Sequence, residues 1–111
     1  MLHWRNRLRQ RQSIRQVYRR GNHQATAHFQ LSLLKQTKPG PTKIAIVIST
    51  KIAKKATVRN KLRRQVRGAL AEMLPSLAPG QDIVITITKV QLAKLSPQAL
   101  KQELAEALSQ S

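Results

Sequence analysis

Apolar and polar residues alternate along several stretches of the chain with the two-residue period of a β-strand. Residues 26–34 alternate in this way, and their apolar side consists of Ala27, Phe29, Leu31 and Leu33. Residues 43–48 alternate as well, and a turn-forming Lys-Pro-Gly-Pro sequence at residues 38–41 separates the two stretches. We therefore expect these two strands to pair as an antiparallel hairpin. A further strand is expected at residues 82–88, which are rich in β-branched side chains.

Three other stretches carry the spacing of three and four residues that is typical of a helix with one buried side. The strongest covers residues 57–74. A short helix is expected to begin at Ser13, where Ser-x-x-Gln has the form of a capping box, and to end at Gly21. The last helix is expected to follow the N-cap Ser96, with Pro97 as its first residue. Its buried stripe comprises Leu100, Leu104 and Leu108.

The order helix, strands, helix, strand, helix predicts a two-layer α+β domain with helices against a small mixed sheet. The length of 111 residues fits a single domain over residues 1–111. Residues 1–12 hold four arginines without apolar periodicity and are expected to form a flexible basic arm. Cysteine is absent, and the longest apolar run, residues 44–48, is far shorter than the roughly 20 residues of a membrane helix. We expect a soluble, cytoplasmic protein without a membrane partner.

The charge of the chain points to its binding partner. The sequence has 21 Lys and Arg against 4 Asp and Glu, a net charge of +17, and residues 1–67 contain no acid. Such an excess weakens the compact state through self-repulsion unless a polyanion neutralises it. The composition therefore favours nucleic acid as the partner, with an anionic membrane surface as the second candidate.

The helix expected at residues 57–74 concentrates cations on one face. On a helical wheel its apolar residues share one arc, and the other arc carries Asn60, Lys61, Arg63, Arg64 and Arg67. Arg59 lies at the border and is expected to swing outward. Cations at a helix N-terminus cost about 0.3–1 kcal/mol each, and like charges one turn apart cost about 0.2–0.5 kcal/mol per pair. Because this face destabilises the free protein, we interpret it as a nucleic-acid-binding surface. Upstream, the surface is extended by Lys51, Lys54 and Lys55.

The residues suited to catalysis are not brought together by the predicted elements. His3, His23 and His28 fall in the arm, a loop and a strand, so nothing directs two imidazoles to one phosphate. The four acids lack the spacing of paired carboxylates or metal ligands. We expect no catalytic residue and no metal site in the protein. The polar face shared by His28, Gln30 and Ser32 is either exposed to solvent or the floor of a groove for a nucleic-acid strand.

The basic helix and its surroundings resemble the bacterial ribonuclease P protein subunit. The signature of that family, Arg-Asn-Arg, one spacer, Lys-Arg, two spacers, Arg, matches residues 59–67, with Lys61 at the third position. The basic N-terminus, the Phe29 strand and the C-terminal amphipathic helix extend the match over nearly the whole chain. The resemblance implies an αβββαβα fold of the ribosomal protein S5 domain 2-like class, with a left-handed βαβ crossover through the basic helix.

The resemblance also implies a function. Family members assist endonucleolytic removal of the 5′ leader from precursor tRNA, while a catalytic RNA performs the hydrolysis with Mg²⁺. The expected partners are this RNA and precursor tRNA, with no obligate protein partner and no cofactor bound by the protein alone. The alternative is a ribosome-associated or other structural RNA-binding protein with no role in cleavage.

Site residues carry over by position. Contacts to the catalytic RNA fall on Arg59, Asn60, Lys61, Arg63, Arg64 and Arg67. The leader cleft falls on Ile14, Val17, Tyr18 and Ser32. Because Ile14 and Ser32 replace aromatic residues typical of the cleft, Tyr18 is the expected stacking platform, and we expect weaker leader stacking here.

Overall fold

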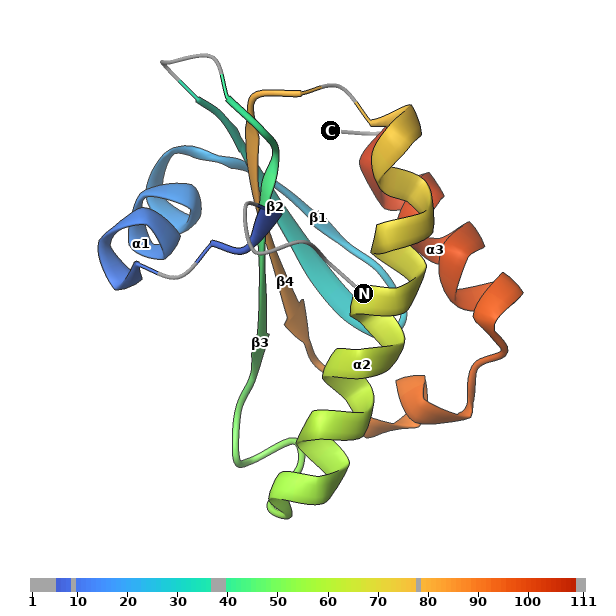
Figure 1. Cartoon of the computed structure of the whole chain (residues 1–111). Coiled ribbons are helices and arrows are strands. Elements are labelled where there is room, and N and C mark those ends of the chain that lie inside the picture. The colour runs from blue at the N-terminus through green and yellow to red at the C-terminus, as the bar shows by residue number, and fades with distance from the viewer. Residues whose placement is uncertain (1–5, 9, 37–39, 78, 110–111) are drawn as a thin grey trace.

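The helices and strands follow one another in the order α1, β1, β2, β3, α2, β4, α3 in a computed structural model (Figure 1). The structure describes residues 6–8, 10–36, 40–77 and 79–109. The helices are α1 Arg11–Arg20, α2 Ala56–Met73 and α3 Pro97–Ser109. The strands are β1 Asn22–Ala25, β2 Phe29–Lys35, β3 Lys43–Ile48 and β4 Gln81–Ile87. Short 3₁₀ turns occupy Leu74–Ser76 and Val90–Lys94.

The four-stranded sheet has the order β1-β2-β4-β3, so the expected pairing of the second and third strands is wrong. β2 pairs with β4 in antiparallel orientation, and β3 pairs with β4 in parallel. Ile83, Val84 and Ile85 are fully buried. A strand that is apolar on both faces is most stable in the middle of a sheet, which explains why β4 separates β2 from β3. The mixed sheet and the βαβ unit through α2 agree with the α+β fold that the resemblance implies.

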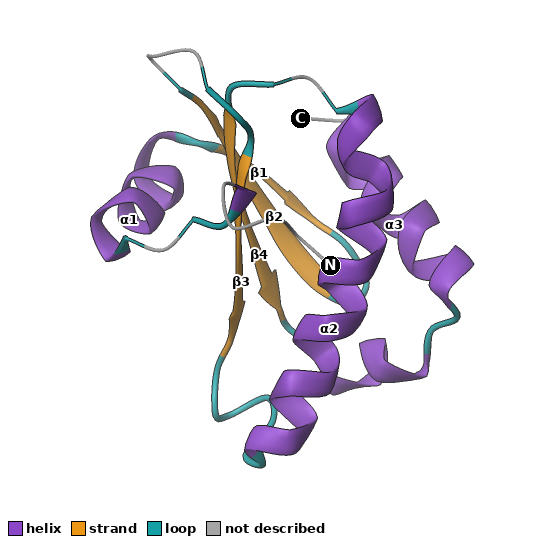
Figure 2. Cartoon of the chain, in the orientation of Figure 1, coloured by secondary structure: helices purple, strands orange, loops and turns teal. Residues whose placement is uncertain are grey.

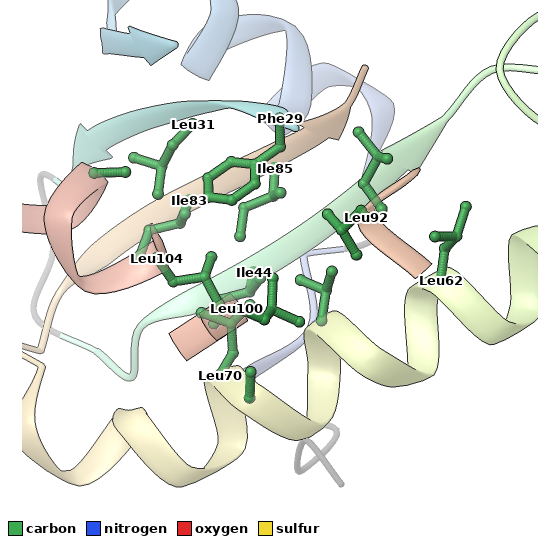
Figure 3. Packing of buried hydrophobic residues seen from close by; sticks show 14 of the residues in the cluster. Phe29, Leu31, Ile44, Leu62, Leu70, Ile83, Ile85, Leu92, Leu100 and Leu104 are labelled. Atoms are coloured by element: carbon green, nitrogen blue, oxygen red, sulfur yellow. The ribbon is translucent and has the colours of Figure 1, made fainter. Parts of the chain in front are cut away.

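Helices cover both faces of the sheet. Figure 2 shows α2 and α3 on one side of the strands and α1 on the other. The main core lies between the sheet and α2 with α3, and its side chains interdigitate in Figure 3. A smaller cluster lies under α1 and consists of Leu8, Val17, Ala45 and Val84. The two clusters hold the helices at fixed places on either side of the strands, which positions the surfaces described below.

The boundaries of α2 and α3 follow the sequence pattern closely. α2 begins one residue before the predicted start, and its last turn tightens into the 3₁₀ segment that contains Pro75. At α3, the backbone N–H of Ala99 donates to the Ser96 hydroxyl at 3.1 Å, so the predicted N-cap is confirmed. Of the predicted stripe, Leu100 and Leu104 are buried, and Leu108 is half-buried against the same core.

The first helix and the first predicted strand begin elsewhere than expected. α1 begins at Arg11 after Gln10 and has no side-chain cap, so Ser13 lies inside the first turn and the capping box is wrong. β2 begins at Phe29 because Thr26 closes the β1–β2 turn. The Thr26 N–H donates to the Phe29 carbonyl at 2.8 Å, and the Thr26 hydroxyl donates to the same oxygen at 3.0 Å. Ala27 and His28 therefore belong to this turn instead of the strand.

Part of the expected basic arm is attached to the sheet. Arg7 forms a parallel bridge with Ile44, and the Leu8 N–H donates to the Ile44 carbonyl at 2.8 Å. Leu8 is buried in the cluster under α1. Residues 6–8 therefore lie along β3 and residues 11–12 open α1, which corrects the flexible arm for these residues; residues 1–5 and 9 lie outside the described residues.

Candidate RNA-binding site

The basic surface consists of Lys51, Lys54, Lys55, Arg59, Asn60, Lys61, Arg63, Arg64 and Arg67. α2 carries most of it, because Leu62, Val66 and Leu70 are fully buried against the sheet and leave the cationic positions outside. Asn60, Lys61 and Arg64 are exposed. The lysines precede α2 in the turn after β3 and are exposed as well. The structure thus brings the predicted polyanion-binding residues together on one side of the molecule.

Arg59 differs from the rest of this surface. Its Nη1 donates to the carbonyls of Ala53 and Lys54, both at 2.8 Å, so the guanidinium folds back onto the turn before α2. The expected outward swing is wrong. The cause is local, because α2 has no side-chain N-cap and these two carbonyls lie within reach of the first helical turn. Arg59 therefore braces the loop that carries the three lysines.

Among the described residues, the cations of the basic surface form no ion pair with an acid. Of the acids that pair within the described part of the chain, Glu72 contacts Lys101 and Glu103 contacts His28, and neither partner belongs to this surface. Burial lowers the pKa of Arg67, and the guanidinium groups of Arg7 and Arg63 lower it further. A lowered arginine pKa reports a poorly solvated cation among like charges. The surface is therefore electrostatically costly without an external anion.

The expected leader-cleft residues lie around α1, and they divide by burial. Val17 and Ser32 are fully buried, so neither side chain can contact a leader in this structure. Ile14 is half-buried and packs against the cluster under α1. Tyr18 is 37% exposed, so its aromatic ring is accessible to a ligand. The cleft assignment is thus corrected for Val17 and Ser32, which are buried beneath α1 and do not line a cleft.

Beside Tyr18, the sheet presents a row of side chains that we call the open sheet face, composed of Gln30, Val47 and Thr86. The register aligns Gln30 with Thr86 and Thr86 with Val47 across β2, β4 and β3. All three are half-buried. The Tyr18 hydroxyl and Thr86 Oγ1 are 2.7 Å apart in a hydrogen bond that joins α1 to this row. Thr86 and Val47 were missed by sequence reasoning, because only the strand order shows which residues are neighbours.

His23, which was expected in a loop, lies in β1 and fixes the end of α1. Its Nε2 is 3.0 Å from the Tyr18 carbonyl, and its Nδ1 is 2.7 Å from Ser32 Oγ. Because a carbonyl can only accept, Nε2 carries the hydrogen, and in the neutral ring the Ser32 hydroxyl donates to Nδ1. His23 thus connects the buried Ser32 to the backbone of Tyr18. His28, in contrast, lies apart and holds Glu103 of α3 at 2.9 Å between Nδ1 and Oε1.

The described residues offer cations and hydrogen-bonding groups but no grouped metal ligands. Among residues 6–8, 10–36, 40–77 and 79–109, no three His, Asp or Glu side chains lie close enough to hold a metal ion. In the same residues, no helix is both long and apolar enough to cross a bilayer. What the arrangement can do chemically is bind phosphates on one side and stack or hydrogen-bond a strand on the other.

Comparisons with known proteins show which family the chain is similar to. A family model described as Ribonuclease P matches residues 2–111. A ribonuclease P protein component of Rippkaea orientalis is 42% identical over 74% of this chain and 68% of its own length. That of a Nostoc species is 34% identical over 96% of this chain and 91% of its own length.

Solved structures extend the similarity to the fold. The RNase P protein from Thermotoga maritima is 25% identical and superposes with a TM-score of 0.82 over 96% of this chain and 98% of its own. An RNase P protein structure from Staphylococcus aureus, at 18% identity, shares the fold with a TM-score of 0.79 over 94% of this chain and 93% of its own. With a family model matched along almost the whole sequence, the chain belongs to the ribonuclease P protein component family.

Proposed function

We propose that this protein docks on the RNA of ribonuclease P through its basic surface and holds the 5′ leader of precursor tRNA against the open sheet face. The observation that carries the proposal is the basic surface, whose cations lack ion-pair partners among the described residues. Phosphates of a large RNA would supply the missing charge and release counterions from it. The named relatives support this proposal over a ribosome-associated protein without a role in cleavage.

In this proposal the RNA and the protein have different roles. The RNA, with Mg²⁺, performs the hydrolysis, and the protein contributes affinity and orientation. Tyr18 stacks on a leader base, while Gln30 and Thr86 offer hydrogen-bonding groups beside it. The helix α2, which carries most of the basic surface, and the helix α1, which lies beside the open sheet face, are on opposite sides of the sheet (Figure 1). One molecule can therefore contact the RNA and a substrate strand at once. The protein thus raises the affinity and specificity of the RNA for precursor tRNA.

Reconstitution tests the proposal. Purified protein is combined with a bacterial ribonuclease P RNA at low Mg²⁺, and cleavage of precursor tRNAs with leaders of different lengths is measured. We expect the protein to stimulate cleavage and to lower KM most for leaders long enough to reach the open sheet face. Absence of stimulation would contradict the whole proposal. Stimulation that does not depend on leader length would contradict only the role of the open sheet face, and not the docking on RNA.

A further inference from the structure

Arg7 lies beside α2 although it is far from it in sequence. Its parallel bridge to Ile44 places it on the outer edge of β3. Paired residues in a sheet point to the same face, so the Arg7 side chain lies on the face that carries Ile44 and α2. Leu8 points the other way, into the cluster under α1. The Leu8 N–H bond to Ile44 and a 2.8 Å bond from Asn6 Nδ2 to the Thr42 carbonyl fix the segment on both sides.

Arg7 is therefore held among like charges. Arg63 and Arg67 of α2 are half-buried, as is Arg7. The pKa of Arg67 is lowered first by burial and then by Arg7 and Arg63. The Arg7 Nε atom is buried and has no hydrogen-bond partner among the residues that the structure describes. A buried N–H without an acceptor and three cations without an acid both indicate a position for an external anion.

We infer that Arg7, Arg63 and Arg67 form one phosphate-binding site, whose ligand is a phosphodiester of the ribonuclease P RNA. The inference rests on the proposed function for the identity of the RNA. A phosphate accepts several hydrogen bonds at once and matches the planar fork of a guanidinium. The site would join two segments that are far apart in sequence, the edge of the sheet and the middle of α2, to one point of the RNA backbone. It extends RNA contact beyond the helix motif.

The test compares Arg7→Gln with the wild type in two measurements. Removing a repelling cation should raise the melting temperature of the free protein. The same change should weaken binding to ribonuclease P RNA by about tenfold and lower the slope of log K against log salt by about one unit. Arg15→Gln is the matched control, because Arg15 is exposed on α1 across the sheet. It removes the same charge and should change RNA affinity by less than about twofold.

Opposite signs for stability and affinity would support the site. An RNA affinity equal to that of Arg15→Gln would overturn it. A melting temperature that falls together with affinity would also overturn it, since Arg7 would then act only as a structural clamp.

A second arm uses inorganic phosphate and no RNA. Phosphate should raise the melting temperature of the wild type more than that of Arg7→Gln. Equal gains would overturn the site. Failure of the wild type to bind ribonuclease P RNA would instead contradict the proposed function and the choice of RNA, while the phosphate arm still decides whether the three arginines bind an anion.

Discussion

The proposed function gives the basic surface and the open sheet face different modes of binding, because the two are built differently. The first comes mainly from one continuous helix, and its members act through charge. The second is assembled from three strands, and a 2.7 Å hydrogen bond between Tyr18 and Thr86 joins it to α1. Charge tolerates small displacements, whereas stacking and hydrogen bonding do not. We therefore expect the proposed docking on RNA to tolerate small structural changes, and the proposed recognition of a substrate strand to depend on packing.

The largest effect is expected from the double variant Arg64→Ala/Arg67→Ala. Losing two charge-assisted phosphate contacts should weaken ribonuclease P RNA binding by about 2–4 kcal/mol and flatten the salt dependence by about two units. The dependence of KM on leader length should remain. Filter binding over a salt series measures the first effect, and cleavage kinetics the second.

The control for this prediction is Arg15→Ala/Arg19→Ala, which removes two exposed arginines from α1. Its RNA affinity should stay near that of the wild type. If both double variants lose affinity equally, net charge alone would explain binding, and the distinction between the two surfaces would fail.

Substitutions of Tyr18 test the open sheet face. Tyr18→Ala should weaken leader binding by about 1–3 kcal/mol through lost stacking, with no change in affinity for ribonuclease P RNA. Tyr18→Phe keeps the ring and loses the bond to Thr86, so it should retain most of the leader affinity. Precursor tRNAs with and without a leader separate these effects in a competition assay. Equal losses for the two variants would show that the hydroxyl, and not the ring, contacts the leader.

The basic surface could be predicted from the sequence because a helix maps spacing directly onto faces. Leu62, Val66 and Leu70 define the buried side, and the positions between them define the cationic one. Arg59 is the exception, because its direction depends on two carbonyls in the preceding turn. No sequence pattern shows where such acceptors lie.

The open sheet face could not be predicted in the same way. Alternation shows which residues share a face of one strand, but it does not show which strands are neighbours. The Pro-Gly turn after β2 favoured a hairpin with β3, yet β4 entered between them because both of its faces are apolar. The neighbours Gln30, Thr86 and Val47 follow from that insertion. Ser32 was correctly placed on the polar face, but its burial depends on α1 and on the hydrogen bond to His23.

Ser32→Ala measures how much the buried network contributes to the open sheet face. The change removes the hydroxyl that donates to His23 Nδ1, and the free energy of unfolding should fall by about 1 kcal/mol. Because Ser32 is fully buried, leader affinity should fall less than in Tyr18→Ala. Chemical denaturation and leader competition provide the two numbers. A leader defect larger than that of Tyr18→Ala would mean that Ser32 contacts the strand directly.

The smallest effect is expected from a substitution at Gly68. It tests whether RNA binding by the basic surface depends on the shape of α2 as well as on charge. A Cβ added at this half-exposed helical position would meet nothing within 4 Å in the protein. Gly68→Ala should therefore stabilise the free protein by about 0.5–1 kcal/mol, since alanine loses less backbone entropy in a helix. If binding rests on charge, affinity for ribonuclease P RNA should not change. A loss of affinity in the stabilised variant would show that an RNA backbone approaches α2 closely at this point, so that the basic surface would share the geometric demands of the open sheet face.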